Sequence, residues 1–292
     1  MLEEKNKAAS VGLVVDSGST KTDWCVCVDG KQVCRCTTQG INPFHQSDDY
    51  IYNIIGEELK PKLKAAFTSL NLGEPSVRSI RFYGAGCRGA AIEGLRKILQ
   101  SAFPEATEIE VGSDLLAAAH AVCGSEEGIA CILGTGANSG LYDGKTIIAN
   151  VSPLGYILGD EGSGAVLGKL FINGLFKGDV PSTIREEFLE TTGQTLDDII
   201  RRVYREPMAN RYLASLSPFI RSHIDCREVR DIVVRNFVDF FRLNVDHYGH
   251  KDLAIGAVGS VAYYYRDELN EAARLCGYKM GKIVKSPFEF EG

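Results

Sequence analysis

The chain has 292 residues, of which 45% are hydrophobic and 24% are charged, a composition typical of a globular protein with room for two domains. Its net charge of -6 and its lack of any long Lys/Arg run argue against nucleic-acid binding and favour a small-molecule partner. The charged N-terminus reaches its first apolar run only at Val11, unlike a signal peptide, and no window approaches the ~20 apolar residues of a membrane span. Nine scattered cysteines are typical of reduced thiols, so we expect a cytoplasmic protein without a membrane partner.

The first half of the chain is predicted to open with three strands and to continue with alternating helices and strands. The strands are expected at residues 11–15, 22–28, 31–38, 79–83 and 108–111, and the helices at about 47–69, 88–101 and 114–123. A hairpin followed by strand–helix alternation predicts a mixed sheet with helices on both faces.

The second half repeats the opening. Its expected strands are 129–133, 138–142, 145–150, 253–257 and 279–284, with helical patterns at 161–248 and 260–275. No linker separates the halves, so we place a domain boundary near Gly112, giving lobes 1–112 and 113–276, and the segment 277–292 is a candidate for return to the first lobe. Closely packed lobes predict a ligand cleft between them.

The turn at residues 16–22 follows a short apolar strand. Glycine and small hydroxyl residues in such a turn let main-chain N–H groups approach a phosphate, and Lys21 can add a positive charge. Asp16 would repel a phosphate unless a magnesium ion lay between them. Taken alone, the turn would also fit a simple polar hairpin.

A second glycine-rich turn, at residues 134–138, also follows an apolar strand, more than a hundred residues later. Each copy then reaches an Asp-Gly hairpin, at residues 29–30 and 143–144. The pair predicts a duplicated architecture with a nucleotide between the copies. No Walker-type phosphate loop is present in the sequence.

Asp114 stands at the start of a helix, directly after the strand at 108–111. A carboxylate there could simply complement the helix dipole. It could also act as the general base that accepts a proton from a sugar hydroxyl during phosphoryl transfer. Its place at a strand end facing the expected cleft favours the second interpretation.

Four glycines surround an Asp-Glu pair in residues 153–164, a density greater than a helix cap requires. Glycine allows a backbone to come close to a ligand, so this segment, with Gly155 and Asp160, is expected to contact substrate.

Residues 84–89 match the G-x-G-x-x-G pattern of a dinucleotide-binding turn, after a strand and before a helix. This rival interpretation is a lone match, and it leaves both hairpin turns unexplained.

Four cysteines flank the first Asp-Gly turn. With Asp29 and Gly30 as a two-residue loop, Cys25 is expected opposite Cys34. Period-two geometry would then place the sulfurs of Cys27 and Cys36 on the same face, so that all four lie together. A flat row of sulfurs does not converge on a tetrahedral metal, so packing is favoured over a zinc or iron–sulfur site.

As an ordered set, these motifs resemble the sugar kinase, Hsp70 and actin superfamily of ATPases. Within it, the chain resembles the N-acetylglucosamine kinases grouped with the BadF/BadG/BcrA/BcrD ATPase family. The similarity covers most of the chain and rests on residues 16–22, 40–43, 114, 134–138, 155–164 and 256–262. It implies an α/β fold of two ribonuclease-H-like lobes, as in actin-like ATPases, with MgATP in the nucleotide cleft between them.

The resemblance also implies roles for individual residues. Asp114 matches the catalytic base, Asp16 the residue that engages magnesium, and Asn42, Gly155 and Asp160 match sugar-binding positions. The nucleotide-binding positions would be Asp16, Ser17, Gly18, Ser19, Thr20, Lys21, Gly134, Thr135, Gly136, Asn138, Gly259 and Ser260. Phosphoryl transfer would go to the 6-hydroxyl of the sugar, and family analogy implies a homodimer.

Two departures concern the choice of sugar. Pro43 and Phe44 follow Asn42 where a vertebrate-type enzyme has His-Trp, and residues 153–155 replace a Gly-Trp-Gly. The expected reaction is conversion of N-acetylglucosamine to N-acetylglucosamine 6-phosphate, with glucosamine or another amino sugar as the alternative substrate.

Two other classes share this fold. ATP-driven activators of 2-hydroxyacyl-CoA dehydratases and benzoyl-CoA reductases bridge their subunits with an iron–sulfur cluster and carry a Gly-Gly-Gln-Asp run, where this chain has residues 111–114, Val-Gly-Ser-Asp. A non-catalytic sugar sensor would be expected to lack the base or the phosphate turns, and both are present.

Overall fold

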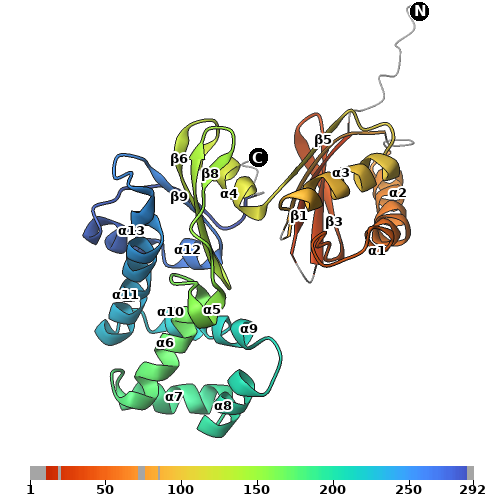
Figure 1. Cartoon of the computed structure of the whole chain (residues 1–292). Helices are drawn as coiled ribbons and strands as arrows, with labels where there is room; N and C mark the ends of the chain where they lie inside the picture. The colour runs from red at the N-terminus through yellow and green to blue at the C-terminus, as the bar shows by residue number, and fades with distance from the viewer. Residues whose placement is uncertain (1–10, 19–20, 72–75, 85, 288–292) are drawn as a thin grey trace, which may run out of the picture. The chain divides into compact units, whose positions relative to one another are not determined.

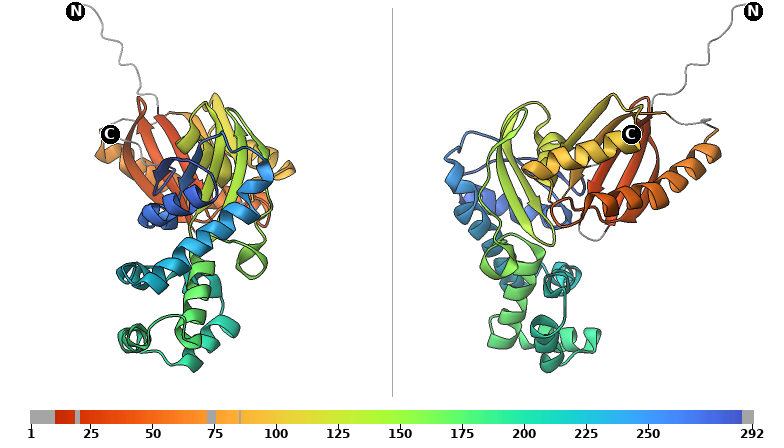
Figure 2. Two further views of the ribbon diagram at one scale, coloured as in Figure 1. Left: turned by 90° about the vertical axis from the view of Figure 1, so that its left-hand side faces the viewer. Right: turned by 45° about the vertical axis from the view of Figure 1, so that its right-hand side comes forward.

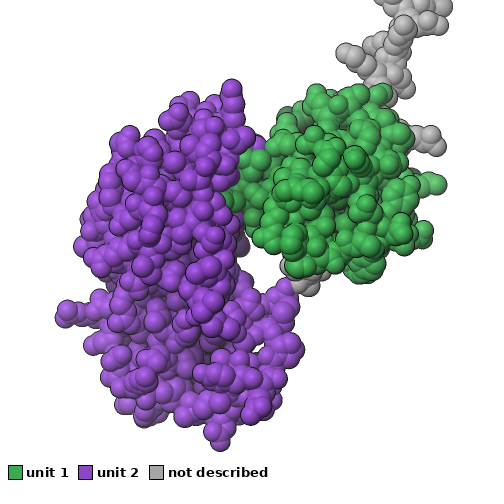
Figure 3. Space-filling view, in the orientation of Figure 1, with its two compact units in different colours: residues 1–117, 290–292 green, residues 118–289 purple. Residues whose placement is uncertain are grey.

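The computed structural model describes residues 11–18, 21–71, 76–84 and 86–287. These residues form two compact units that divide between Ala117 and Ala118 (Figure 1 and Figure 3). The sequence placed the boundary near Gly112, at the end of a strand, whereas the division falls inside the helix that follows. Within the described ranges, no helix is long and apolar enough to cross a membrane.

The first unit contains a five-stranded sheet in the order β3-β2-β1-β4-β5. β2 is antiparallel to both of its neighbours, and β1, β4 and β5 run parallel. The elements are β1 (Val11–Ser17), β2 (Lys21–Val28), β3 (Lys31–Gln39), α1 (Asp48–Asn53), η1 (Ile54–Leu59), α2 (Lys60–Ser69), β4 (Val77–Gly84), α3 (Ala90–Ala102), β5 (Glu108–Gly112) and α4 (Asp114–Cys123).

The core of this unit lies on one face of the sheet. Alternate residues of β1, namely Val11, Leu13 and Val15, are buried there with Trp24 and Phe82. The same core includes side chains from α1 to α3. Both crossovers, from β3 to β4 and from β4 to β5, move in the same direction, so right-handed connections place their helices on the same side. Helices α1 to α3 therefore cover one face of this sheet, and the predicted cover of the other face stays a prediction.

A β-bulge at Val33 shifts the pairing of β2 with β3. Cys25 consequently lies opposite Arg35, and its predicted pairing with Cys34 is wrong. Because successive side chains of a strand alternate between faces, Cys34 packs toward the core and Cys25 lies on the other face. The expectation that all four sulfurs share one face is wrong as well.

The second unit contains a five-stranded sheet in the order β10-β9-β6-β7-β8. Its elements are β6 (Glu127–Leu133), β7 (Ala137–Asp143), β8 (Ile147–Ala149), α5 (Gly155–Leu158), α6 (Gly164–Lys177), α7 (Ser182–Thr192), α8 (Leu196–Tyr204), α9 (Ala209–Ala214), α10 (Ser217–Ser222), α11 (Arg227–Leu243), η2 (Val245–Tyr248), β9 (Ile255–Val258), α12 (Ser260–Tyr264), α13 (Arg266–Leu275) and β10 (Met280–Val284). The final strand, β10, pairs with β9 in this sheet.

The two sheets have the same topology. In each, an antiparallel three-stranded meander is followed by two strands that run parallel to the first strand of that meander. β1 thus corresponds to β6, and β4 to β9. The predicted duplication and the α/β fold class are confirmed.

The core of the second unit packs β6 and β9 against α6, α11 and α13. Phe171, Phe237 and Phe241 are fully buried in it. The helices α7 to α10 extend the unit at one end (Figure 2). The predicted single helix at 260–275 is divided at Tyr265, whose hydroxyl donates to the Ser217 carbonyl at 2.7 Å.

Candidate functional site

The predicted residues of the first unit gather at the carboxyl ends of its parallel strands. Ser17, at the end of β1, lies beside Gly84, at the end of β4, and β5 ends next to it at Gly112. Ligands of α/β proteins usually bind at this edge. The β1–β2 turn, the loop at 86–89 and the start of α4 follow directly from these strand ends.

Hydroxyl groups fix the β1–β2 turn to the loop after β3. The Oγ of Ser17 lies 2.6 Å from the Oγ1 of Thr22 and donates to the Ile41 carbonyl at 2.8 Å. Both hydroxyl oxygens also accept the Ile41 N–H at 3.0 Å. Ser17 is fully buried, so its side chain holds the turn in place. The predictions for Ser19 and Thr20 fall outside the described residues.

Asp16 lies in a group of carboxylates on the sheet face opposite the core. It pairs directly with Asp23 across β1 and β2. Burial, followed by the neighbouring carboxylates of Asp23 and Asp114, raises the pKa of Asp16. Mutual repulsion of this kind would be relieved by a bound cation. The described residues contain no cluster of three or more His, Cys, Asp or Glu side chains that could hold a metal ion, so these carboxylates would bind Mg²⁺ only together with oxygens of a ligand.

Asp23 was not singled out from the sequence. Its carboxylate accepts from Lys21 Nζ at 2.7 Å and from Thr37 Oγ1 at 2.8 Å. Burial opposes ionisation, but these hydrogen bonds outweigh it and lower the pKa of Asp23. The contact with Asp23 thereby holds Lys21 beside the β1–β2 turn. The Gly18 N–H closes this turn by donating to the Lys21 carbonyl at 2.9 Å. The period-two pattern of β2, which places residues 21 and 23 on one face, could have identified it.

Asp114 begins α4, but the neighbouring Ser113 serves as the cap. Ser113 Oγ accepts the Leu116 N–H at 3.2 Å, while Asp114 Oδ1 accepts the Leu115 N–H at 2.8 Å. Burial raises the pKa of Asp114 against the opposing effect of hydrogen bonds from the Leu115 N–H and from its own N–H. A partly desolvated carboxylate with a raised pKa, close enough to influence Asp16, has the properties of a general base.

Asn42 is held by its own loop. Its Oδ1 accepts the Phe44 N–H at 3.1 Å, and its N–H donates to Gln46 Oε1 at 2.8 Å. Its side chain lies directly against Gly86, where any Cβ would overlap with Asn42 Oδ1, and Gly86 has φ +81°. The glycine of the G-x-G-x-x-G match therefore makes room for Asn42, which explains the motif without a dinucleotide.

A pocket of about 610 Å³ adjoins the Asn42 loop and is lined in part by Pro43, Phe44 and Arg88. The Arg88 guanidinium stacks 4.2 Å from the centre of the exposed Phe44 ring. Pro43 and Phe44, which depart from the vertebrate-type pattern, thus line a pocket next to Asn42.

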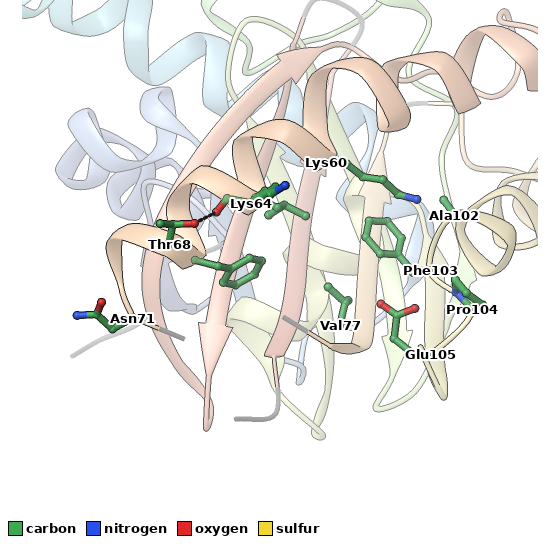
Figure 4. A pocket seen from close by; sticks show the side chains of 11 residues that line it. Lys60, Lys64, Thr68, Asn71, Val77, Ala102, Phe103, Pro104 and Glu105 are labelled. Carbon is green, nitrogen blue, oxygen red and sulfur yellow. Dashed lines mark hydrogen bonds between the residues drawn. The ribbon is translucent and has the colours of Figure 1, made fainter. Parts of the chain in front are cut away.

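A larger cavity, of about 900 Å³, lies on the first unit between α2 and the end of α3 (Figure 4). Lys60 lies over the Phe103 ring at its edge, 5.6 Å from the ring centre. None of the predicted site residues lines this cavity, so it takes no part in the candidate site.

In the second unit, the β6–β7 turn is bonded to the start of α6. Gly134 N–H donates to the Gly136 carbonyl at 3.0 Å, which closes the turn. The first amides of α6, from Gly164 and Ala165, donate to the Gly134 and Thr135 carbonyls at 2.8 and 3.2 Å. Backbone groups of α6 therefore help to set the shape of this turn.

The β9–α12 turn contacts the β6–β7 turn closely. Gly259 has φ +126°, and a Cβ there would overlap with the Leu133 carbonyl oxygen. Gly134, Thr135 and Ser260 line one cavity of about 320 Å³, together with residues of α9 and α10. The structure thus brings together these predicted nucleotide-binding residues, which are more than a hundred positions apart in the chain.

Asn138 lies apart from that cavity lining. Its Oδ1 accepts the Ser139 N–H at 2.9 Å and Asn150 Nδ2 at 2.8 Å. The side chain therefore ties β7 to the segment after β8, and its contact with nucleotide stays a prediction.

Asp160 connects the glycine-rich segment to the β6–β7 turn. Its Oδ1 accepts the Gly155 N–H at 3.2 Å, and its carboxylate also accepts the Ala137 N–H. Burial raises the pKa of Asp160, which the two N–H groups partly counter. A Cβ on Gly136 would lie 3.0 Å from Asp160 Oδ2, so that position has little space for a side chain.

No protein-family model matches this chain, and no curated protein does, so membership of the BadF/BadG/BcrA/BcrD family stays a prediction. Among solved structures, the chain is similar to a Porphyromonas gingivalis protein described as a "putative N-acetylglucosamine kinase". The identity is 48%, 95% of each chain is covered, and the TM-score is 0.85. A Chromobacterium violaceum protein with the same description is 19% identical over 94% of this chain and 95% of its own, with a TM-score of 0.68. EutJ of Carboxydothermus hydrogenoformans, an ethanolamine utilization protein, is 16% identical over 95% and 85%, with a TM-score of 0.53. The last two similarities show the fold alone.

Proposed function

This chain belongs to the sugar-kinase family of the Porphyromonas gingivalis protein, and we propose that it transfers the terminal phosphate of ATP to N-acetylglucosamine. The proposed product is N-acetylglucosamine 6-phosphate. The observation that carries the proposal is the 48% identity over 95% of both chains, which leaves little of either protein without a counterpart.

The first unit would supply the proton and cation chemistry. Asp114 accepts the proton of the attacking 6-hydroxyl, because burial raises its pKa and so strengthens it as a base. Asp16 would hold Mg²⁺ through its carboxylate, beside Asp23. When bound, the ion would neutralise charge on the phosphates. Lys21, held by Asp23, would add a positive charge on the same side.

The second unit would bind nucleotide mainly through backbone. Gly134, Thr135 and Gly136 form a phosphate-binding turn, and Gly259 with Ser260 would contact the adenosine side. The cavity lined by Gly134, Thr135 and Ser260 and the close contact of Gly259 with Leu133 support this assignment.

Asn42, Gly155 and Asp160 are the proposed sugar-binding residues. Asn42 is braced by its loop, so its amide NH₂ is kept for a ligand hydroxyl while its oxygen holds Phe44 N–H. Phe44 and Arg88, beside Asn42, would contact the substituent that distinguishes one amino sugar from another.

We propose a cytoplasmic location, where thiols stay reduced. All nine cysteines are free thiols, in agreement with that proposal. Burial raises the pKa of Cys87 to about 12 and that of Cys36 to about 11, so these thiols stay protonated and unreactive near neutral pH.

Coupled ADP release tests the proposal. Purified protein with MgATP would be assayed with N-acetylglucosamine, glucosamine, N-acetylmannosamine, glucose and no sugar. We expect the strongest stimulation by N-acetylglucosamine, and NMR of the product should place the phosphate on the 6-oxygen. A preference for another amino sugar would correct the substrate only. Sugar-independent hydrolysis by a brown, oxygen-sensitive preparation would instead favour the reductase-activator class.

A further inference from the structure

The cavity of about 900 Å³ on the first unit lies between α2 and the end of α3, apart from the candidate site (Figure 4). Sites for small molecules usually measure about 300–1,000 Å³, so this cavity has room for a ligand of ordinary size. All the described residues that line it belong to the first unit. Its ligand can therefore be inferred from this one unit and from the chemistry of its lining.

One side of the cavity is a single face of α2. The lining residues of this helix are spaced by three and four positions and include Lys60, Leu63, Lys64, Phe67 and Thr68. At about 100° per residue, these five side chains fall within a sector of about 140°. Leu63 and Phe67 occupy the side of this sector that is buried in the core, whereas the other three are exposed. The helix thus gives the cavity an apolar base and a cationic rim.

The opposite wall is the segment after α3, which backbone hydrogen bonds hold in place. The Phe103 N–H donates to the Leu99 carbonyl at 2.9 Å, and the Thr107 N–H donates to the Arg78 carbonyl of β4 at 2.9 Å. Phe103 is almost fully buried, so its ring completes the apolar base. This wall is formed before any ligand binds, which lowers the cost of binding.

The rim carries more positive than negative charge. Lys60 and Lys64 are four positions apart on α2, where like charges repel each other. Among the described residues, neither lysine has an acid as an ion-pair partner, and the Lys60 ammonium lies 5.6 Å from the centre of the Phe103 ring. In the described lining, Glu105 is the only acid, which leaves one net positive charge. A bound anion would relieve the repulsion between the two lysines.

We propose that this cavity binds a small amphipathic monoanion, a carboxylate on an apolar body such as a phenyl ring with a short chain. The carboxylate pairs with Lys64 and Lys60, and the apolar body lies over Leu63, Phe67 and Phe103. The methylene groups of the lysine stems add apolar contact at the rim. This ligand is not a substrate of the proposed kinase, because no residue proposed to bind sugar or nucleotide lines the cavity.

The charge balance distinguishes this class of ligand from others. A nucleotide or a sugar phosphate carries two or more negative charges, which one net positive charge neutralises only in part, and Glu105 would repel the remainder. Anionic membrane surfaces attract clusters of about four or more basic residues, whereas the described lining has two lysines. A monoanion matches the charge, and the apolar base requires an apolar body.

Three probes that share one apolar body test the class of ligand. Phenylbutanoate, phenylbutanol and phenylbutylamine would each be used to displace anilinonaphthalene sulfonate, a fluorescent aromatic monoanion, from the full chain. We expect phenylbutanoate to act at a concentration about fivefold lower than phenylbutanol, and phenylbutylamine to be weaker than both. No binding of the fluorescent probe, equal displacement by acid and alcohol, or displacement by MgATP as effective as that by phenylbutanoate would overturn the proposal.

Charge reversal tests the role of Lys64. Lys64→Glu should weaken the binding of phenylbutanoate about tenfold and change that of phenylbutanol by less than about twofold. Lys97→Glu is the matched control, since Lys97 is exposed on α3 and lies outside the described lining, and it should bind both probes like the wild type. Equal losses in the two variants would mean that only the net charge of the chain matters, contrary to the proposal.

A bulky side chain tests the location of the apolar body. Thr68→Trp should abolish the binding of both phenylbutanoate and phenylbutanol, because Thr68 is exposed on the cavity face of α2. Ser69→Trp is the control: Ser69 is also exposed, is turned about 100° away and lies outside the described lining. Circular dichroism should be unchanged in both variants. Binding that survives Thr68→Trp, or that is lost equally in both, would place the probes elsewhere and contradict this site.

Discussion

The β1–β2 turn of the first unit and the β6–β7 turn of the second stand at equivalent places in two sheets of the same topology, but their surroundings differ in charge. Asp16, Asp23 and Lys21 lie at the first turn. The second turn is shaped by backbone bonds to α6 and by one carboxylate, Asp160, that accepts from backbone N–H groups. Duplication thus preserved the backbone frame and let the side chains diverge, so we expect substitutions in the first unit to affect turnover and those in the second to affect binding and stability.

The largest expected effect is on turnover in Asp114→Asn. Removing a general base should lower kcat by about a thousandfold while leaving the affinity for ATP nearly unchanged. Steady-state kinetics and nucleotide titration would measure the two quantities. Asp252→Asn, at an exposed carboxylate of the second unit, should behave like the wild type. Near-normal turnover in Asp114→Asn would remove Asp114 from the mechanism.

The next-largest effect is expected at Gly259, where the β9–α12 turn contacts the β6–β7 turn. Gly259→Ala places a Cβ against the Leu133 carbonyl at φ +126°, so we expect a loss of about 2 kcal/mol in the free energy of unfolding and a higher KM for ATP. Gly178→Ala is the control, because Gly178 has φ +90° but open space around it. Urea unfolding should show the smaller loss in the control. Equal losses would mean that backbone strain alone, without the contact, limits this position.

Asp160→Asn should have a smaller effect on the same turn. An amide offers one oxygen where the carboxylate accepts from both Gly155 and Ala137, so we expect a loss of about 1 kcal/mol and weaker binding of ligand. Thermal unfolding and the KM values for ATP and sugar would measure both. Glu161→Gln, at the adjacent acid, serves as the comparison. An unchanged Asp160→Asn variant would show that the two N–H groups need no charged acceptor.

The smallest expected effect separates the stability cost of Asp114 from its catalytic role. Burial raises its pKa in the folded state, so the folded protein holds this proton more tightly than the unfolded chain does. The stability that comes from the protonated form is present below the unfolded pKa and is lost as pH rises through the folded pKa. Asp114→Asn has no carboxyl group to titrate at this position and therefore lacks this loss. As pH rises from 4 to 7, the melting temperature of the variant minus that of the wild type should increase. Unfolding in EDTA without nucleotide would measure it, and a difference that is constant with pH would contradict the assignment.

Local patterns in the sequence were enough for most of the fold. The strands at residues 11–15 and 129–133 and the small-residue turns after them were recognisable because alternation and turn chemistry act within a few residues. The equivalence of the two halves followed from the order of these elements, and the sheets bear it out. The resemblance based on the same motifs indicated a sugar kinase, as the similarity to the Porphyromonas gingivalis protein also does.

The sequence alone did not reveal which hydroxyls and carboxylates are committed to the fold. The hydroxyl of Ser17 is buried and donates to the Ile41 carbonyl, a contact that the sequence did not indicate. Asp23 was overlooked, although it holds Lys21. Both depend on contacts between strands and loops, which a linear pattern does not encode.

By itself, the sequence determined the two strand–turn–strand copies, the small-molecule class and the positions of the acids at strand ends, because these depend on composition and on neighbours in the chain. Only the tertiary structure decided the bulge that turns Cys25 away from Cys34, the fit of Asn42 against Gly86, and the contact of Gly259 with Leu133. Each of these depends on atoms from distant segments that compete for the same space. Burial likewise sets the pKa of a carboxylate only once the surrounding chain has excluded water from it.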